Sequence, residues 1–254
     1  MTTIAHPAAA SSRSSEPLHH VLAVTRLLFV NKVQIIYTPL IALGGIFLLN
    51  LAIWWIIIIA SGNTGVNHLG YSGAASYIYV YAIIIAVQVI LRTFPFSLGF
   101  GVTRRNFYLG AVVAFLLLSV GFAAVLTIMS SIEIATHGWG VGGRMFAPLY
   151  FTNAFWLARF AMYFLVFLFC LFVGSVIATI YLRWRALGIT VFFALLAIVI
   201  VAAIAEVTIG HQWPSIGSWF RTTGTLGVVA WTLVPSVIAA FGGFFVLRRT
   251  TPKS

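Results

Sequence analysis

The sequence predicts an all-α membrane protein in which six transmembrane helices follow an amphipathic helix lying at the membrane surface. The first observation behind this prediction is composition: 62% of the 254 residues are hydrophobic, only 7% are charged, and the mean hydropathy is +1.10. A soluble domain needs a more polar exterior, so most of this surface is expected to face lipid. The second observation is that Lys and Arg collect in alternate gaps between six long apolar stretches, as in a multi-pass protein inserted in one orientation.

The amino-terminal residues predict a tail followed by the amphipathic helix. Residues 1–15 are small and polar, which indicates a disordered cytoplasmic tail. Ser15, Glu16 and Pro17 then supply a capping hydroxyl, a carboxylate and a proline, which are typical of the first turn of a helix. Within residues 16–34, apolar and basic residues recur at the spacing of an amphipathic helix. This segment is therefore expected to lie at the inner membrane surface. A simple extension of the first span explains the same pattern equally well.

Six apolar stretches within residues 35–247 are expected to cross the membrane, since a spanning helix needs about 20 residues. They cover residues 35–60, 74–91, 107–129, 160–181, 187–205 and 225–247. Residues 248–254 are expected to form a second cytoplasmic tail. The connections between the spans leave no room for a soluble catalytic domain, so any hydrolytic motor has to be another chain.

The basic residues set the predicted orientation. Eleven lie in gaps on the side of the amino terminus, and they are Arg13, Arg26, Lys32, Arg92, Arg104, Arg105, Arg183, Arg185, Arg248, Arg249 and Lys253. Only Arg144 and Arg221 lie clearly on the other side. Positively charged loops stay in the cytoplasm, so both termini are expected there. The charges follow membrane boundaries and form no aromatic-interleaved stripe, which argues against nucleic acid as a partner.

Ionisable groups that do chemistry inside a membrane are nearly absent from the sequence. Its three carboxylates are Glu16 near the amino terminus, Glu133 after the third span and Glu206 at the outer end of the fifth, so no acid pair forms at membrane depth. HExxH is absent as well, and neither a catalytic site nor a cofactor or metal site is predicted in this chain. Residues 70–73 spell GxSG, which is similar to the nucleophile motif of rhomboid proteases. No span contains a histidine to activate the serine, so an ordinary loop turn is expected.

Arg159 stands at the outer boundary of the fourth span. Pairing of its guanidinium with Glu133 or Glu206 would shape an outer gate. The apolar run 160–181 is long enough to span alone, however. The favoured interpretation is therefore that the Arg159 side chain reaches up to water at the outer interface.

The segment between the second and third spans gives the strongest local signal for a partner. Residues 92–110 are basic and aromatic and contain no acid. Anchoring at the inner membrane boundary explains Arg104 and Arg105 by itself. It does not explain four phenylalanines that the predicted topology leaves exposed, namely Phe94, Phe96, Phe100 and Phe107. Apolar side chains projecting from a short cytoplasmic element indicate a docking surface.

In these features the chain resembles the permease subunits of the ABC-2 type exporter family, especially small bacterial six-span members encoded apart from their ATPase. Residues 99–110, GFGVTRRNFYLG, are similar to the phrase often found at this point in bacterial members. The segment 206–223, which carries His211, Trp213, Pro214 and Trp219, resembles the long outer segment before the last span of that family. The topological resemblance covers nearly the whole chain.

The resemblance implies an ATP-driven exporter in a bacterial cytoplasmic membrane. Two permease chains, identical or different, would join two separate ATPase chains that bind ATP and Mg. The sequence has no GxxxxGK[ST] phosphate loop, so this chain is not expected to hydrolyse ATP, and it lacks the EAA-type motif of importer permeases. By the same resemblance the residues that couple to the ATPase are Arg92, Phe94, Phe96, Phe100, Gly101, Thr103, Arg104, Arg105 and Phe107.

Two other classes of function stay open. One is an accessory or sensory membrane subunit whose spans anchor and transmit. The other is a secondary carrier or channel, which the lack of mid-membrane charges disfavours. The sequence does not rank substrates, because an apolar cavity between two permeases would suit a drug, a lipid or a hydrophobic peptide.

Overall fold

The computed structural model describes residues 16–61, 71–148 and 154–248, and in these ranges the chain is almost entirely helical, with no strand. The predicted all-α class is therefore confirmed. The predicted tail 1–15, nearly all of the tail 248–254 and the outer loop with His68 lie outside the described residues.

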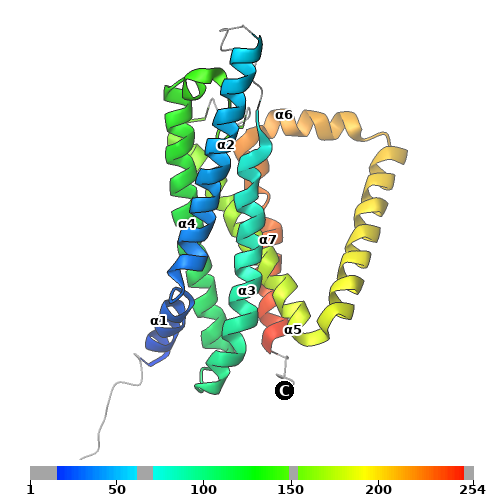
Figure 1. Cartoon of the computed structure of the whole chain (residues 1–254). Helices are drawn as coiled ribbons and strands as arrows, with labels where there is room; N and C mark the ends of the chain where they lie inside the picture. The colour runs from blue at the N-terminus through cyan, green and yellow to red at the C-terminus, as the bar shows by residue number, and fades with distance from the viewer. Residues whose placement is uncertain (1–15, 62–70, 149–153, 249–254) are drawn as a thin grey trace, which may run out of the picture.

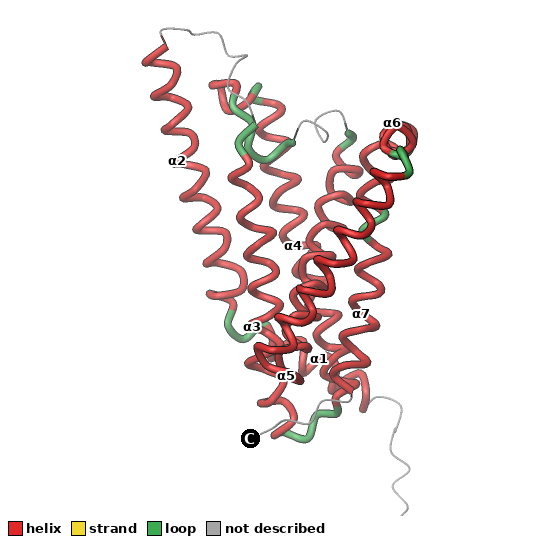
Figure 2. Tube along the Cα trace, turned by 90° about the vertical axis from the view of Figure 1, so that its right-hand side faces the viewer, coloured by secondary structure: helices red, strands yellow, loops and turns green. Residues whose placement is uncertain are grey.

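The described helices form an elongated bundle, along which most of them run from one end to the other (Figures 1 and 2). They are α1 (Glu16–Leu28), α2 (Thr38–Ser61), α3 (Tyr77–Gly99), α4 (Arg104–Ala135), α5 (Trp156–Ile209), α6 (Trp213–Ala230) and α7 (Leu233–Arg248). Short helical turns lead into α2 at Val33–Tyr37 and into α3 at Gly73–Ser76, and another follows α4 at Gly138–Gly142.

Five helical stretches of the described chain are long and apolar enough to cross a membrane. They are Val33–Ser61, Gly73–Gly99, Arg104–Ala135, Trp156–Ile209 and Trp213–Leu247. Helices of this length and composition are what a bilayer core requires, so the chain is a membrane protein.

α5 is longer than one membrane crossing requires and is broken near its middle. Its 54 residues would extend for about 80 Å as one straight helix, against a hydrocarbon core of about 30 Å. At Arg185 the backbone angles of φ 58° and ψ −151° interrupt the helix, and the chain reverses direction there (Figure 1). The predicted spans 160–181 and 187–205 lie in what we call the first limb and the second limb of α5.

The chain between the second limb and α7 is helical where the sequence predicts a loop. α6 runs across one end of the molecule and joins the second limb, which stands apart, to α7 in the bundle (Figure 1). Gly224 interrupts α6 at φ 67°, a conformation that glycine adopts without strain. A turn at residues 231–232 then starts α7. Pro235 consequently lies in the first turn of α7, where proline is tolerated.

Small residues let the helices of the core approach closely. The core lies where α3, α4, the first limb of α5 and α7 meet, and its fully buried small residues include Ala82, Ala86, Ala114, Ala123 and Ala178. Gly174 in α5 faces α3 so closely that a Cβ atom there would lie 2.5 Å from the carbonyl oxygen of Ile83. Gly110 in α4 faces α1 in the same way, with a Cβ atom 2.6 Å from Val24. At these positions the helix backbones pack at short distance, beside the large side chains of the core.

We predict that Gly174→Ala destabilises the bundle, whereas Gly121→Ala does not. Both glycines lie inside helices, where alanine is favoured over glycine by about 0.5–1 kcal/mol, but only Gly174 has backbone atoms where the methyl group must go. Overpacking of this kind typically costs about 1–3 kcal/mol. Thermal unfolding of the purified protein in detergent should show a lower Tm for Gly174→Ala and an unchanged or higher Tm for Gly121→Ala. Equal shifts in the two variants would contradict the close contact between α3 and α5.

Candidate functional site

One end of the bundle gathers most of the positive charge. α1, the connection from α3 to α4, the break in α5 and the end of α7 lie at this end, which we call the basic end (Figure 1). Its described basic residues are Arg26, Lys32, Arg92, Arg104, Arg105, Arg183, Arg185 and Arg248. The opposite end carries α6 and the segment after α4, with Arg144, Arg159 and Arg221. The charge asymmetry of the sequence is thus an asymmetry between two ends of the folded molecule.

The connection from α3 to α4 is shorter than the sequence predicts. α3 continues through Pro95 to Gly99, so only residues 100–103 link the two helices. The N–H of Val102 bonds to the carbonyl of Ser97 at 3.2 Å, and Gly101, at φ 76°, bonds to Leu98 at 3.0 Å. This is a Schellman ending, which needs a left-handed residue such as glycine. Thr103 then caps α4 by accepting the N–H of Asn106 at 3.3 Å. Gly101 and Thr103 therefore make the connection rigid.

The expectation of four exposed phenylalanines is wrong for two of them. Phe94 and Phe107 are only 1% and 0% exposed and meet edge to face, with ring centroids 5.2 Å apart. Phe96 and Phe100 are 53% and 72% exposed and lie next to each other, with centroids 4.7 Å apart. The reason is helical phase: because α3 runs on to Gly99, Phe94 joins the inward face while the pair four residues apart points outward. Phe94 and Phe107 brace α3 against α4, and the Phe96–Phe100 pair is the exposed surface.

α1 is a separate helix packed against α4. α1 ends at Leu28, and a turn over residues 29–31 separates it from the helical stretch that leads into α2. Val24, Thr25 and Leu28 are buried, and the Thr25 hydroxyl donates to the carbonyls of Val21 and Gly110 at 3.0 and 3.1 Å. α1 therefore covers the start of α4, next to the exposed phenylalanine pair.

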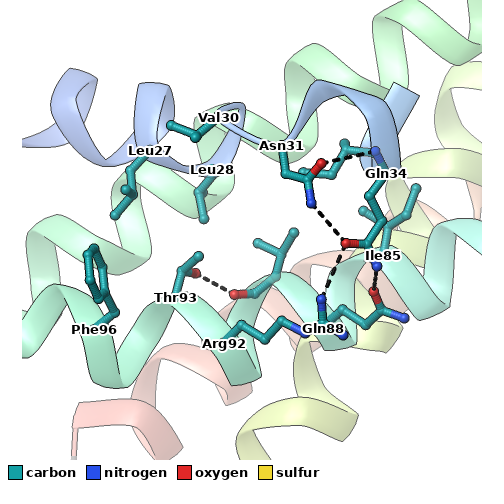
Figure 3. A pocket seen from close by; sticks show the side chains of 12 residues that line it. Leu27, Leu28, Val30, Asn31, Gln34, Ile85, Gln88, Arg92, Thr93 and Phe96 are labelled. Atoms are coloured by element: carbon teal, nitrogen blue, oxygen red, sulfur yellow. Dashed lines mark hydrogen bonds between the residues drawn. The ribbon is translucent and has the colours of Figure 1, made fainter. Parts of the chain in front are cut away.

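A polar network joins the start of the first span to α3 (Figure 3). Gln34 lies at its centre: its Nε2 donates to Oε1 of Gln88 at 2.6 Å, and its Oε1 accepts from Asn31 Nδ2 at 3.0 Å and from Arg92 Nη1 at 3.3 Å. The hydroxyl of Tyr81 also donates to the Gln34 carbonyl at 3.2 Å. Hydrogen bonds of this kind hold helices together where lipid offers no competing partner. Sequence reasoning missed the network, although an amide inside the apolar run 74–91 was a usable signal.

Arg92 thus has a different place from the other predicted coupling residues. It contacts the network rather than the connection, while Arg105 is exposed in the first turn of α4 and Arg104 is half-buried beside it. The predicted coupling residues consequently have different places. Phe94 and Phe107 form the buried contact between α3 and α4, Gly101 and Thr103 shape the turn, and Arg92 belongs to the polar network. Phe96, Phe100 and Arg105 are the exposed part.

At the opposite end, Glu133 fastens the segment that follows α4. Its buried carboxylate accepts the backbone N–H groups of Met145, Phe146 and Ala147, each at 2.9 Å, and the indole N–H of Trp139 at 3.1 Å. Hydrogen bonds to an ionised acceptor are stronger than neutral ones, so this carboxylate organises the end of the bundle.

Arg159 is buried, which corrects the expectation that it reaches water at the interface. It is 8% exposed, and its Nη2 donates to the hydroxyl of Ser131 at 3.3 Å. Nε and Nη1 have no hydrogen-bond partner among the described residues. Arg159 and Glu133 lie at the same end but form no ion pair in the described structure, and Glu206 is exposed on the second limb of α5. The three predicted gate residues are therefore not assembled as one charge cluster.

The GxSG segment forms the expected turn where the structure describes it. The Ser72 hydroxyl donates to Oδ1 of Asn50 at 2.7 Å and accepts the N–H of Ala74 at 3.4 Å, which starts the turn Gly73–Ser76. Nowhere in the described ranges do three His, Cys, Asp or Glu side chains gather to hold a metal ion.

Comparisons with family models, curated proteins and solved structures found no match to this chain. The assignment of a function therefore depends on the geometry described above and on the sequence.

We predict that Glu133→Gln loosens the end of the bundle opposite α1, with Glu206→Gln as the matched control. One of the two acceptor oxygens becomes an NH2 group facing backbone N–H donors, so at least one hydrogen bond is lost and a donor is left buried. The cost should be about 1.5–3 kcal/mol, against less than about 0.5 kcal/mol at the exposed Glu206. A lower Tm and faster amide exchange at Met145, Phe146 and Ala147 are the measurements. Unchanged exchange at these amides would show that the carboxylate does not hold the segment.

Proposed function

We propose that this chain is the transmembrane permease subunit of an ATP-driven exporter, coupled to separate ATPase subunits at its basic end. The observation that carries the proposal is the exposed Phe96–Phe100 pair at the end of α3, where a capped and braced turn leads to the exposed Arg105 in the first turn of α4. Such a surface suits a protein partner, since exposed aromatics and arginine provide much of the binding energy in interfaces.

The proposed topology has six spans with both termini in the cytoplasm. The two limbs of α5 count as the fourth and fifth spans, and the end of α6 together with α7 counts as the sixth. Placing the basic end on the cytoplasmic side follows from the charge bias between the two ends. α1 then lies at the inner surface of a bacterial cytoplasmic membrane, beside the surface that docks the ATPase.

The architecture supports transmission of force from this surface into the bundle. A partner that displaces the Phe96–Phe100 pair would move α3 directly. It would move α4 through the rigid turn and through the contact between Phe94 and Phe107. Rigid packed elements of this kind move as bodies instead of deforming locally. ATP and Mg would bind to the partner subunits, and this chain supplies no phosphate loop of its own.

A second permease chain completes the proposed complex. No residue of the second limb, 186–209, is buried, and this limb stands apart from the bundle (Figure 1). We assign this limb to the substrate path between two permeases, which are two copies of this chain or two different chains. An accessory or sensory subunit and a secondary carrier are the alternatives that the following experiment separates.

The purified chain is predicted to be silent alone and to move substrate only with its ATPase. Proteoliposomes containing the chain, with and without a co-encoded ATPase, should be assayed with ATP or an imposed pH gradient, using lipophilic dyes, a fluorescent phospholipid and a hydrophobic peptide. Flux should require the ATPase and ATP and ignore the gradient, because Glu133 and Glu206 lie in the last turns of α4 and α5 and not in the middle of a span, where proton coupling would need an acid. Flux driven by the gradient in the chain alone would replace the exporter with a secondary carrier. An ATPase complex that moves none of these probes would favour an accessory subunit.

Replacing Phe96 and Phe100 with Ala is predicted to weaken binding of the ATPase at least tenfold, since buried interface aromatics are often worth over 1 kcal/mol each. The double variant Phe241→Ala and Phe245→Ala is the control, because it removes another exposed pair four residues apart, on α7. Both variants should insert and unfold normally. Co-purification and stimulated ATP hydrolysis are the readouts, and equal binding by both variants would place the docking surface elsewhere.

A further inference from the structure

A groove runs between α1 and α3 at the basic end. It consists of two adjoining hollows of about 260 and 300 Å³ that share Leu27 of α1 and Phe96 of α3. Hollows of this size lie near the lower limit for small-molecule sites, so the groove fits part of an elongated ligand rather than a compact one.

The two parts of the groove differ in chemistry. The hollow of about 260 Å³ is lined by Gln34, Gln88 and Arg92 of the polar network, as Figure 3 shows, and the exposed Val30 also lines it. The hollow of about 300 Å³ is lined almost entirely by apolar groups. A ligand that fills both parts therefore has a polar group at Arg92 and a hydrocarbon segment along Leu27 and Phe96.

The charge around the groove is positive. Arg92 is exposed within it, and Lys32 and Arg26 are exposed on the adjoining chain. Glu133 and Glu206 belong to the opposite end, and α1 begins at Glu16, about 16 Å along the helix axis from Leu27. The polar group of the ligand is therefore an anion.

The groove also lies at the depth of a membrane boundary. Its walls include Ile35 from the stretch Val33–Ser61 and Ile85 from Gly73–Gly99, both of which are apolar enough to span a bilayer. Lipid is the amphiphile present at this depth, and basic pockets between membrane helices bind anionic head groups. A soluble peptide would have to leave water to reach the same walls.

We propose that this groove binds an anionic phospholipid, with the phosphate at Arg92 and one acyl chain between α1 and Phe96. The bound lipid would fasten α1 to α3 next to the exposed phenylalanine pair, and so fix the position of the surface that the proposed function assigns to docking. The proposal itself rests on the groove alone and requires neither transport nor an ATPase.

The test uses the full chain in vesicles of phosphatidylcholine containing spin-labelled phosphatidylglycerol or spin-labelled phosphatidylcholine. The wild-type chain should immobilise the anionic probe in preference to the zwitterionic one. Arg92→Gln should reduce this preference about fivefold, the value of one basic contact near a membrane surface. Arg183→Gln removes an exposed charge of the same end outside the groove, where it stacks on Trp184 at 4.6 Å, and should leave the preference unchanged.

A second variant obstructs the hollow that contains Arg92 without changing the charge. Val30→Trp adds bulk at an exposed position that lines this hollow, so it should displace the probe while leaving Tm unchanged. An unchanged preference in both Arg92→Gln and Val30→Trp would overturn the proposal, as would an equal loss in Arg183→Gln. Protection of a Val30→Cys thiol only when a soluble partner protein is added, and equally in both lipids, would assign the groove to that partner instead.

Discussion

The constraint on which this structure depends is that lipid cannot hydrogen-bond a polypeptide backbone. Each N–H and C=O at membrane depth must find its partner within the protein, and long helices meet that demand without help from side chains. At each end of a helix, several backbone N–H or C=O groups have no partner within the helix and need one elsewhere. Here three helix ends are closed by specific groups: the Schellman ending at Gly101, the hydroxyl of Thr103 and the hydroxyl of Ser72. The carboxylate of Glu133 meets the same demand for the backbone N–H groups of the non-helical segment 145–147.

The sequence was sufficient for the class and the helical stretches because both follow from composition and length. The sequence was not sufficient to predict which individual side chains are buried, because their burial depends on how the helices pack. Phe94 and Phe96 stand two positions apart in the same basic and aromatic segment, yet one braces α4 and the other is exposed, since α3 continues for two further turns beyond the predicted boundary. Arg159 was expected in water because its neighbours alone form a complete span, but the bundle closes over it. Whether these residues are buried depends on how neighbouring helices pack against them. A local sequence pattern does not contain that information.

The two ends of the bundle use polar groups in opposite ways. At the basic end, Gln34 shares its amide among several partners, and the surrounding walls are hollowed, so the contact between α1 and α3 is open to a ligand. At the other end the buried Glu133 carboxylate accepts three backbone N–H groups and the indole N–H of Trp139, so its hydrogen bonds hold the chain's own backbone. The candidate functional surface therefore belongs at the basic end, with a structural fastening opposite.

The Glu133 carboxylate also imposes an order on biogenesis. Its three backbone donors follow it by 12 to 14 positions in the chain, so they do not exist at the ribosome when α4 itself is complete. Until those donors are in place the carboxylate is costly to bury, since an unpaired charge pays the full cost of leaving water. Burial of Glu133 as a carboxylate therefore requires the segment through Ala147, which immediately precedes α5. The residue that fastens this end of the finished bundle thus makes the burial of the last turn of α4 depend on chain that is synthesised after it.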